Sequence, residues 1–379
     1  MSIAMILIGV AAIVALFLLL RPRPRPAAPA ERRAVARPQA APAPVAEAPP
    51  DTIPMAEPSP VPPALQAFYR RQADELMPAQ RDSLLEQLRN IPRPPRALHR
   101  LISPEFLSQA SSNELAELVG AEPVIAAKVM SLVNSPMYQL KTPVTSIGQA
   151  VTFLGLNSVR AICMRYMLEE SFTPKSPELR TLFNELWHAS SVASELCARL
   201  SQRLNLPDSG ALLTQMVLSF LGRFATAALL PPELAQRLAR MELLPRSVAE
   251  QEFLGLSAVG LTELLLREWS LPPGLAVDVC AVDAVLTTPP NPEDAARDAR
   301  LALCYLCARL GEQLALNDTP PDLSRVLDSS KPEFHHLNAY LRLPQLKRLP
   351  ELLQSADIVR LMLTLRQSNQ AQAAGTQVH

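Results

Sequence analysis

The side chains best suited to chemistry in this chain are one histidine and a few acids. His188 follows Trp187 in a mostly apolar stretch, and Glu185, Asp278 and Asp283 are acids that could join it. Imidazole and carboxylate groups are ligands of the metal ions that activate water for attack on phosphorus. A catalytic metal needs about three protein ligands, and the sequence supplies one imidazole without defining where the acids lie.

Other catalytic signatures are not found in the sequence. It has no glycine-rich phosphate loop, no nucleophile elbow and no His-Glu-x-x-His helix. Cys304 and Cys307 form a C-x-x-C pair, but no second pair or histidine cluster is near them in the sequence. All the cysteines fall in apolar helical patterns, which is typical of buried free thiols in a reducing compartment. We therefore expect neither a cofactor nor a metal.

The elements that must position these residues are predicted to be helices. Apolar residues recur at i, i+3 and i+4 over most of the chain after residue 64, and glycine accounts for only 11 of 379 residues. Alternating period-two runs are scarce, so the sequence predicts an all-α fold. The formal net charge is zero. This balance gives no bulk attraction to nucleic acid, and we expect no nucleic-acid partner.

The first 20 residues predict a transmembrane anchor. Residues 3–20 are apolar or small, and at about 1.5 Å per residue they just cover a hydrocarbon core of about 30 Å. Arg21, Arg23 and Arg25 follow at once, and positively charged flanks stay in the cytoplasm. The chain is therefore predicted to be a single-pass protein of the inner membrane with its body in the cytoplasm. A cleaved signal peptide is the alternative, since residues 26–30 are small enough to hold a cleavage site.

Further segments flank the globular part. Residues 21–63 contain 14 prolines and are predicted to be a disordered Pro/Ala-rich linker, because proline removes backbone donors and opposes helix formation. Residues 64–90 are predicted to form one amphipathic helix, kinked or divided at Pro78. Towards the other end, residues 288–367 are predicted to form a C-terminal helical extension. Residues 368–379 form a flexible tail.

A run of well-marked helices follows residue 110. Ser111 opens a capping box, and Pro123 stands at the favoured first position of the next helix. That helix ends at Asn134 and Ser135, and a further amphipathic helix ends at Gly155. The Asn-Ser pair admits two roles, as a left-handed cap with a turn or as polar groups that face a ligand. The first role is favoured because both residues are common turn formers.

This pattern resembles the core signature of the HDOD family, a degenerate relative of the HD metal-dependent phosphohydrolases. The resemblance covers about residues 91–287 and implies a two-lobed helical bundle. HD enzymes hold metal with an early His, an adjacent His-Asp pair and a late Asp. In this chain Ser219 and Phe220 replace the pair, and Ser257 stands where the family often has His. Only His188 survives, so the resemblance implies a module without metal or catalysis.

The whole chain is thus predicted to be an all-α protein, an HDOD-like two-lobed helical bundle preceded by a single transmembrane helix and a disordered linker. The resemblance implies a membrane-tethered signalling or scaffold module in bacterial signal transduction. Such a module would bind a signalling protein or a small nucleotide-type ligand. Two alternatives stay open: a residual phosphohydrolase with a rebuilt metal site, and a structural membrane-associated helical protein.

The surface around the Asn-Ser turn is the candidate interaction site. The loop after the turn interrupts an otherwise helical surface, and binding residues often gather on loops held by rigid scaffolds. Two nearby arginines could bind a carboxylate or a phosphate. The alternative is that the asparagine only caps its helix and that the arginines are solvated. The candidate residues are Asn134, Ser135, Tyr138, Lys141, Arg160 and Arg165.

Overall fold

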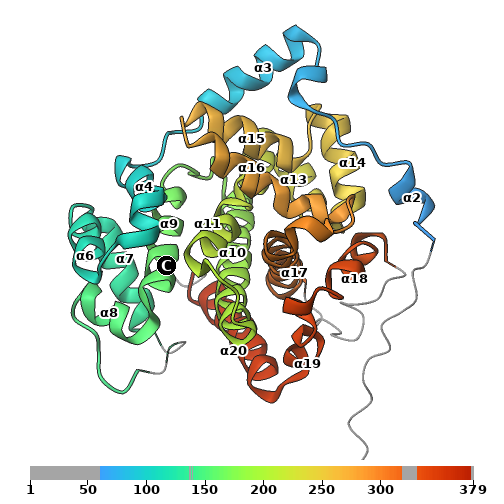
Figure 1. The fold of residues 1–379 in the computed structure, drawn as a ribbon. Helices are drawn as coiled ribbons and strands as arrows, with labels where there is room; N and C mark the ends of the chain where they lie inside the picture. Colours follow the sequence, from blue (N-terminus) through green and yellow to red (C-terminus); the bar gives the residue numbers. More distant parts are fainter. Residues whose placement is uncertain (1–59, 136–137, 139, 318–330, 377–379) are drawn as a thin grey trace, which may run out of the picture. The chain divides into compact units, whose positions relative to one another are not determined.

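The computed structural model describes residues 60–135, 138, 140–317 and 331–376. Regular secondary structure in this part of the chain is helical, without a strand, which confirms the predicted all-α class (Figure 1). The predicted anchor and most of the predicted linker fall in residues 1–59, outside the described residues.

The first lobe consists of α4 to α9, which group together beside the long central helix (Figure 1). Ser111 caps α6 as the sequence predicts, because its hydroxyl accepts from the Glu114 amide at 3.2 Å and the Glu114 carboxylate accepts from the Ser111 amide at 2.7 Å. Gly155 separates α8 from α9 with a φ of 83°, a conformation that favours glycine. The helices are α4 Arg96–Leu101, α5 Pro104–Gln109, α6 Ser112–Gly120, α7 Pro123–Val133, α8 Ile147–Leu154 and α9 Leu156–Glu169.

The second lobe is built around α10, a helix of 28 residues. Ser176 caps its start by accepting from the Leu179 amide at 3.3 Å, and Asn205 ends it in the left-handed conformation with a φ of 53°. The helices of this lobe are α10 Pro177–Leu204, α11 Ser209–Leu218, α12 Leu221–Leu229, α13 Pro232–Ala239, α14 Leu243–Leu254, α15 Ala258–Glu268 and α16 Pro273–Ala281.

The predicted C-terminal extension contributes a core helix. Helix α17 packs along α10 and forms with it the most extensive helix pair among the described residues. Gly311 permits this close approach, since a Cβ there would lie 2.4 Å from the Ala189 carbonyl oxygen. Shorter helices then lead to α20, which returns to α10 (Figure 1). The helices are α17 Ala295–Leu316, α18 Leu337–Tyr340, α19 Leu349–Gln354 and α20 Ala356–Thr376.

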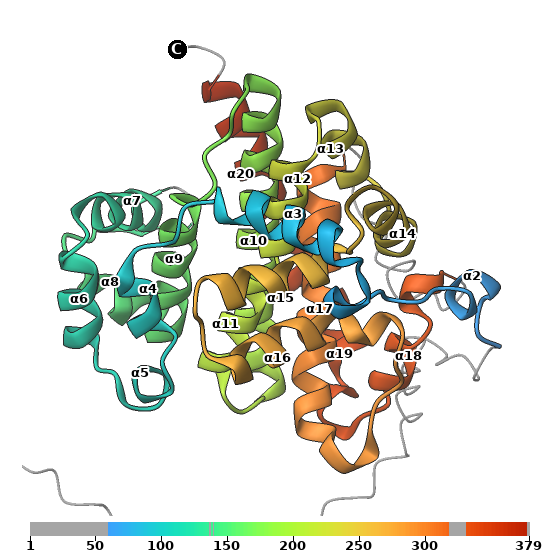
Figure 2. The ribbon, with the colours of Figure 1, turned by 90° about the horizontal axis from the view of Figure 1, so that it is seen from above.

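The segment before the first lobe is divided before Pro78, one of the two outcomes expected there, but it does not form the single amphipathic helix predicted over 64–90. It forms α2 Pro63–Gln66, a 3₁₀ turn at Ala73–Glu75 and α3 Pro78–Arg89. Pro78 begins α3 instead of kinking a longer helix, because the first amide of a helix needs no partner within it. Figure 2 shows α3 lying over the second lobe, where Arg89 pairs with Glu268 of α15 at 3.0 Å.

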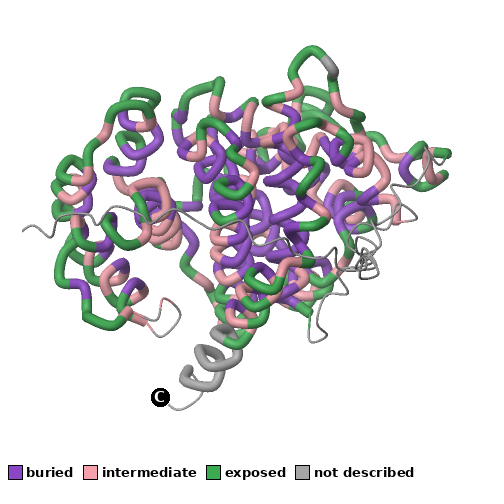
Figure 3. Tube along the Cα trace, turned by 60° about the horizontal axis from the view of Figure 1, so that its bottom comes forward, coloured by how far each residue is buried: buried purple, intermediate pink, exposed green. Residues whose placement is uncertain are grey.

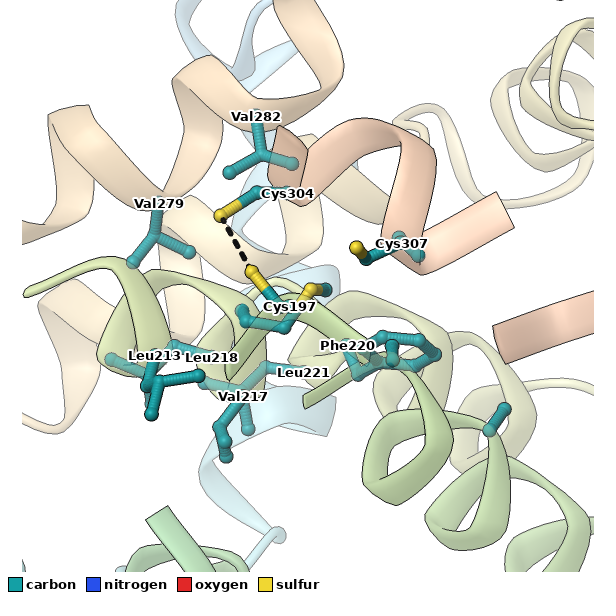
Figure 4. Close-up of a cluster of buried hydrophobic side chains, with 14 of the residues drawn as sticks. Cys197, Leu213, Val217, Leu218, Phe220, Leu221, Val279, Val282, Cys304 and Cys307 are labelled. Carbon is teal, nitrogen blue, oxygen red and sulfur yellow. Dashed lines mark hydrogen bonds between the residues drawn. The ribbon is translucent and has the colours of Figure 1, made fainter. Parts of the chain in front are cut away.

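Buried residues gather in the middle of the protein body (Figure 3). They are mostly apolar, and the cysteines belong to them as predicted. Cys163, Cys197, Cys304 and Cys307 are buried, and Cys280 is half-buried. Figure 4 shows the Cys197 and Cys304 sulfurs facing each other at 4.0 Å, about twice the length of a disulfide bond. Burial raises the pKa of the Cys197 thiol. The Cys197 thiol is therefore protonated, and the buried cysteines act as small apolar side chains.

One helical stretch of the described residues, Ser209–Leu229, is long and apolar enough to cross a membrane. It comprises α11 and α12, and most of it is buried inside the protein body, which is the usual setting of core helices in a globular domain.

Candidate functional site

Ser219 and Phe220 stand where the resemblance would place a metal-binding His-Asp pair, and both side chains are engaged in other contacts. The Ser219 hydroxyl donates to the Met216 carbonyl oxygen at 2.8 Å, within its own helix. Phe220 is only 2% exposed, and Figure 4 shows its ring in the buried apolar cluster. An aromatic ring supplies no ligand for a metal ion, and the neutral hydroxyl is a poor one.

Ser257, the third altered position, is also buried. Its hydroxyl has no hydrogen-bond partner among the described residues, although it directly precedes α15. Glu250 serves the start of that helix instead, since its carboxylate accepts from the Ala258 amide at 2.7 Å. Burial raises the pKa of Glu250. The region around Ser257 therefore contains a buried carboxylate, that of Glu250, which accepts a hydrogen bond from the backbone at the start of α15.

A buried ionic network lies next to these positions. The Glu312 carboxylate of α17 accepts hydrogen bonds from Arg223 of α12, from Arg246 of α14 at 3.2 Å and from Arg309 at 3.4 Å. Burial alone would raise the pKa of Glu312, but the three guanidinium groups lower it to about 2. Arg246 also lies 3.8 Å from Glu250. The network joins three helices through charges that compensate one another.

The donor set does not fit a catalytic metal. In the described part of the chain, no three His, Cys, Asp or Glu side chains are placed to hold a metal ion. His188 is the single imidazole left from the family site, and one imidazole cannot hold the ion. The acids that could have rebuilt the site each pair with an arginine. These pairs are Glu185–Arg240 at 3.1 Å, Asp278–Arg297 at 3.3 Å and Asp283–Arg309 at 3.8 Å.

A pocket of about 680 Å³ opens between α9 of the first lobe and α10 of the second, and we call it the interlobe pocket. Its volume lies within the range of about 300–1,000 Å³ that is usual for small-molecule sites. Leu132 of α7, Leu213 and Val217 of α11 and Leu365 of α20 also line it. Helix α10 contributes one face, on which polar side chains recur every three or four positions. These residues are Arg180, Asn184, His188, Ser191 and Glu195.

His188 lies in the wall of this pocket and carries a free acceptor. Its ring donates a hydrogen bond to the backbone of Leu365, whereas Nε2 has no hydrogen-bond partner in the described structure. Burial and, second, the charge of Arg165 lower the pKa of His188 to about 4. The imidazole is therefore neutral near pH 7. We assign its proton to Nδ1, which leaves the Nε2 lone pair buried and without a partner in the described structure.

Arg165 forms the opposite side of the pocket and links the two helices. Its Nη1 donates to the Ser191 hydroxyl at 2.9 Å, and its Nη2 lies 3.9 Å from the Glu169 carboxylate. The guanidinium carbon sits 4.5 Å from the centroid of the Tyr166 ring, in cation–π contact. These contacts hold the guanidinium in place at the lobe boundary.

The structure divides the predicted interaction residues into two groups. Tyr138 and Arg165 line the interlobe pocket, as does His188. Ser135 and Lys141 are not among its lining residues, and Lys141 is exposed. Of the four positions compared with the HD site, the retained His188 alone reaches the pocket. The others, Ser219, Phe220 and Ser257, are not in its wall.

Arg160 does not belong to the interaction surface that the sequence predicted. It is 1% exposed and cannot present its guanidinium to a partner. Nη1 donates to the Leu101 carbonyl oxygen at 3.1 Å, and Nη2 donates to the Gly210 carbonyl oxygen and, at 3.1 Å, to the Thr214 hydroxyl. Burial lowers the pKa of Arg160 to about 10. Arg160 therefore ties α9 to α4 and α11.

Asn134 has a structural role, but a different one from the left-handed cap that the sequence suggested. Its φ is −83°, so its backbone is not left-handed. The side-chain amide instead pairs with residue 144 in both directions. Nδ2 donates to the Val144 carbonyl oxygen at 2.8 Å, and Oδ1 accepts from the Val144 amide at 2.7 Å. Asn134 thus fastens the end of α7 to the start of the next helical segment.

Sequence reasoning missed most of the polar face of α10. Arg180, Asn184 and Glu195 share this face with His188 in the interlobe pocket. The signal was present as polar residues at intervals of three to four positions in a helix whose other faces are apolar. Any solvent-exposed helix face shows the same pattern of polar residues. The sequence pattern alone therefore does not reveal that α9 packs beside this face and that the two helices enclose a pocket.

Comparisons with known proteins agree with this architecture. Residues 91–284 match the family model of the HDOD domain. The crystal structure of an HDOD domain protein with unknown function from Geobacter sulfurreducens is 20% identical, over 75% of this chain and 97% of that chain, with a TM-score of 0.54. A structure from Shewanella amazonensis SB2B named "Putative phosphohydrolase" is 18% identical, over 76% of this chain and 98% of that chain, with a TM-score of 0.51. No curated protein matched the sequence.

Proposed function

Because the chain belongs to the HDOD domain family, we propose that it is a catalytically inactive module that acts in signal transduction by binding a protein partner or a nucleotide-derived signal. The observation that carries the proposal is the state of positions 219 and 220. HD-type hydrolysis requires a metal-activated water. Ser219 is bonded to its own helix and Phe220 is packed in the core, so neither supplies a ligand.

We also propose that an uncleaved N-terminal anchor holds the body at the cytoplasmic face of the inner membrane. The support is the apolar stretch 3–20 followed by Arg21, Arg23 and Arg25. A Pro-rich tether of about 3.1 Å per residue would let the body reach up to about 130 Å from the bilayer. A cytoplasm-specific reporter fused after residue 64 should be active. A mature protein without residues 1–30 would instead favour the signal peptide.

Metal content and hydrolysis test the absence of catalysis. The full chain, purified in detergent without chelator, should contain far less than one Zn, Mn, Fe or Mg per molecule and should not cleave a phosphodiester when these ions are added. The matched variant is His188→Ala. If the wild-type protein carries close to one metal per chain and cleaves a phosphodiester, and if both properties disappear in this variant, the residual phosphohydrolase is the correct function.

Crosslinking in membranes tests the signalling role. The full chain should capture signalling proteins through the pocket side of the first lobe, where Tyr138 and Arg165 lie. The Tyr138→Ala variant should lose that capture, whereas Arg237→Ala, at an exposed position of α13, should retain it. If no signalling protein is captured, or if capture is the same in all variants, the structural role gains support.

A further inference from the structure

The side chain of Asn134 binds both backbone groups of Val144, ten positions further along the chain. Nδ2 donates to the Val144 carbonyl oxygen at 2.8 Å and to the Met130 carbonyl oxygen at 3.0 Å. Oδ1 accepts from the Val144 amide at 2.7 Å. A primary amide can do this because it combines two donors with an acceptor. The Asn134–Val144 pair therefore brings together the two ends of the segment that lies between these residues.

Both ends of this segment are tied to helices. Asn134 directly follows α7, and its bond to Met130 holds its side chain against the last turn of that helix. Val144 is 3% exposed and therefore packs in the interior. The Thr145 amide after it donates to the Gln149 side chain of α8 at 2.7 Å. The segment is thus anchored on both sides. Surface segments of about 6–16 residues whose ends adjoin are frequently functional.

Tyr138 lies in this segment and reaches the interlobe pocket. Its amide donates to the Ser135 carbonyl oxygen at 3.2 Å, directly after Asn134. Its side chain lines the pocket together with Arg165 of α9 and Glu195 of α10. Burial and, second, the charge of Glu195 raise the pKa of the phenol. Tyr138 is therefore a first-lobe residue placed beside helices of both lobes.

The tyrosine has no polar contact of its own that would hold its ring in the pocket. Its hydroxyl forms no hydrogen bond with a described residue. Arg165 differs in this respect, since its Nη1 donates to the Ser191 hydroxyl at 2.9 Å. The position of Tyr138 therefore depends on packing and on the backbone that carries it. Among the described residues, that backbone is fixed by the turn at Ser135 and by the Asn134–Val144 pair.

We propose that Asn134 is a positioning residue for Tyr138, and that the Asn134–Val144 pair places the phenol ring where a partner protein meets the interlobe pocket. The inference rests on the proposed function, because it names a residue on which the binding surface of the signalling module depends. Asn134 is not in the pocket wall, so its contribution is indirect. A side chain that is already in place does not have to be ordered on binding, which lowers the cost of association.

The tyrosine itself reports whether this inference is correct. The chain has five tyrosines, so ring-labelled tyrosine gives a simple NMR spectrum of the full chain in detergent, and Tyr138→Phe assigns the signal of residue 138. In Asn134→Ala this signal should move towards that of free tyrosine. The phenol pKa should fall towards its usual value of about 10, because water then reaches the ring. An unchanged signal and an unchanged titration in Asn134→Ala would contradict the inference.

A matched variant separates positioning from a general loss of stability. Ser146 lies two residues beyond Val144, and its hydroxyl caps α8 by accepting from the Gln149 amide at 3.2 Å. Ser146→Ala should lower the unfolding midpoint as the loss of a cap does, and it should leave the Tyr138 signal in place. If Ser146→Ala moves the tyrosine as far as Asn134→Ala does, the effect is one of stability and the inference is wrong.

A second variant decides the matter if Asn134→Ala does not fold. Asn134→Asp keeps an acceptor for the Val144 amide and loses the donor that binds the Val144 and Met130 carbonyl oxygens. It should therefore shift the Tyr138 signal in the same direction. A signal at the wild-type position in Asn134→Asp would contradict the inference.

Crosslinking in membranes measures what the position of Tyr138 contributes to binding. Asn134→Ala should reduce capture of the crosslinked signalling protein about as much as Tyr138→Ala does. The double variant should lose no more than Tyr138→Ala alone, because both changes remove the same contact. Additive losses would show that Asn134 acts through a different contact, and the inference would fail.

The inference and the proposed function fail in different ways. If Asn134→Ala displaces the tyrosine but capture is the same with and without the Tyr138 side chain, the partner surface of the proposed function is wrong, whereas the effect of Asn134 on Tyr138 is confirmed. If capture requires Tyr138 but is unaffected by Asn134→Ala, the inference is wrong and the proposed function stands.

Discussion

Gly222 and the carbonyl group of Ala258 bring α12 and α15 into backbone contact. A Cβ at residue 222 would lie 1.7 Å from the Ala258 carbonyl oxygen, and the Gly222 amide donates to the Thr262 hydroxyl at 2.8 Å. Residue 222 follows the altered pair at 219–220, and residue 258 follows Ser257. The segment that follows the altered pair and the segment that follows Ser257 are thus joined by close packing of backbone.

This contact makes Gly222 intolerant of any side chain. Gly222→Ala should destabilise the protein by about 3 kcal/mol or more, because the obstructing atom is a helix carbonyl that cannot rotate away. Gly148→Ala is the matched control, since the nearest atom to its Cβ would lie at 4.0 Å and alanine favours the helix by about 0.5–1 kcal/mol. Urea unfolding of both variants measures the difference. Equal midpoints would show that the two helices can separate without loss.

Arg160 and Arg165 lie on the same helix, and their replacement should destabilise the protein by different amounts. Arg160→Met should cost about 2–4 kcal/mol, because the buried Leu101 and Gly210 carbonyl oxygens lose a charged donor. Arg165→Met should cost about 1 kcal/mol or less, since its ion pair with Glu169 is long at 3.9 Å. Thermal unfolding of the two variants tests the order. If Arg165→Met is the more destabilising change, the pocket residue is the structural one.

Local signals in the sequence were sufficient for the helices and their caps. Ser111 with Glu114, Pro123 and Gly155 act through neighbours a few residues away, so their roles follow from the sequence alone. Pro78 shows the limit of this approach, since proline can kink a helix or begin one. The outcome depends here on α3 lying against α15.

Contacts between residues far apart in the chain could not be predicted from the sequence. Arg160 and Arg165 are alike in type, and only the packing of α9 against α4 and α11 decides which one is buried. Arg246 and Glu312 are 66 positions apart, and nothing local indicates that they meet. The family resemblance supplied the fold and the altered positions. It did not supply the interlobe pocket, whose wall needs α9, α10 and α20 in place.

Glu312 holds together three arginines, so its charge should be essential for stability. Glu312→Gln should cost about 3–5 kcal/mol, because it leaves buried guanidinium groups without sufficient counter-charge. Glu263→Gln is the control, since that carboxylate pairs with Arg267 on the surface and such pairs contribute about 0–1 kcal/mol. Chemical denaturation at pH 7 compares them. A loss near zero for Glu312→Gln would show that the network is dispensable.

The pH dependence of stability should report His188 between pH 6.5 and 4, a range that it shares with His336, whose pKa burial also lowers. The pKa of His188 falls from 6.5 to about 4 on folding, because burial and the charge of Arg165 oppose protonation. Between these two values the unfolded chain binds the proton and the folded chain does not, so stability is complete above pH 6.5 and declines as pH falls towards 4. A shift of this size corresponds to at most about 3 kcal/mol, and less where water reaches the ring.

The titration of Glu312 can be distinguished from that of His188 in this experiment, because the two occur at different pH. Its folded pKa is about 2 against a reference of 4.5, so its contribution is lost at lower pH, between 4.5 and 2. The His188→Phe variant should therefore flatten the stability profile between pH 6.5 and 4 and leave the decline below pH 4 in place. NMR of the imidazole should show His188 neutral at pH 6, protonated on Nδ1 and with Nε2 free. A His188 signal that titrates near pH 6.5 would mean that water reaches the ring, and it would contradict the buried, neutral imidazole.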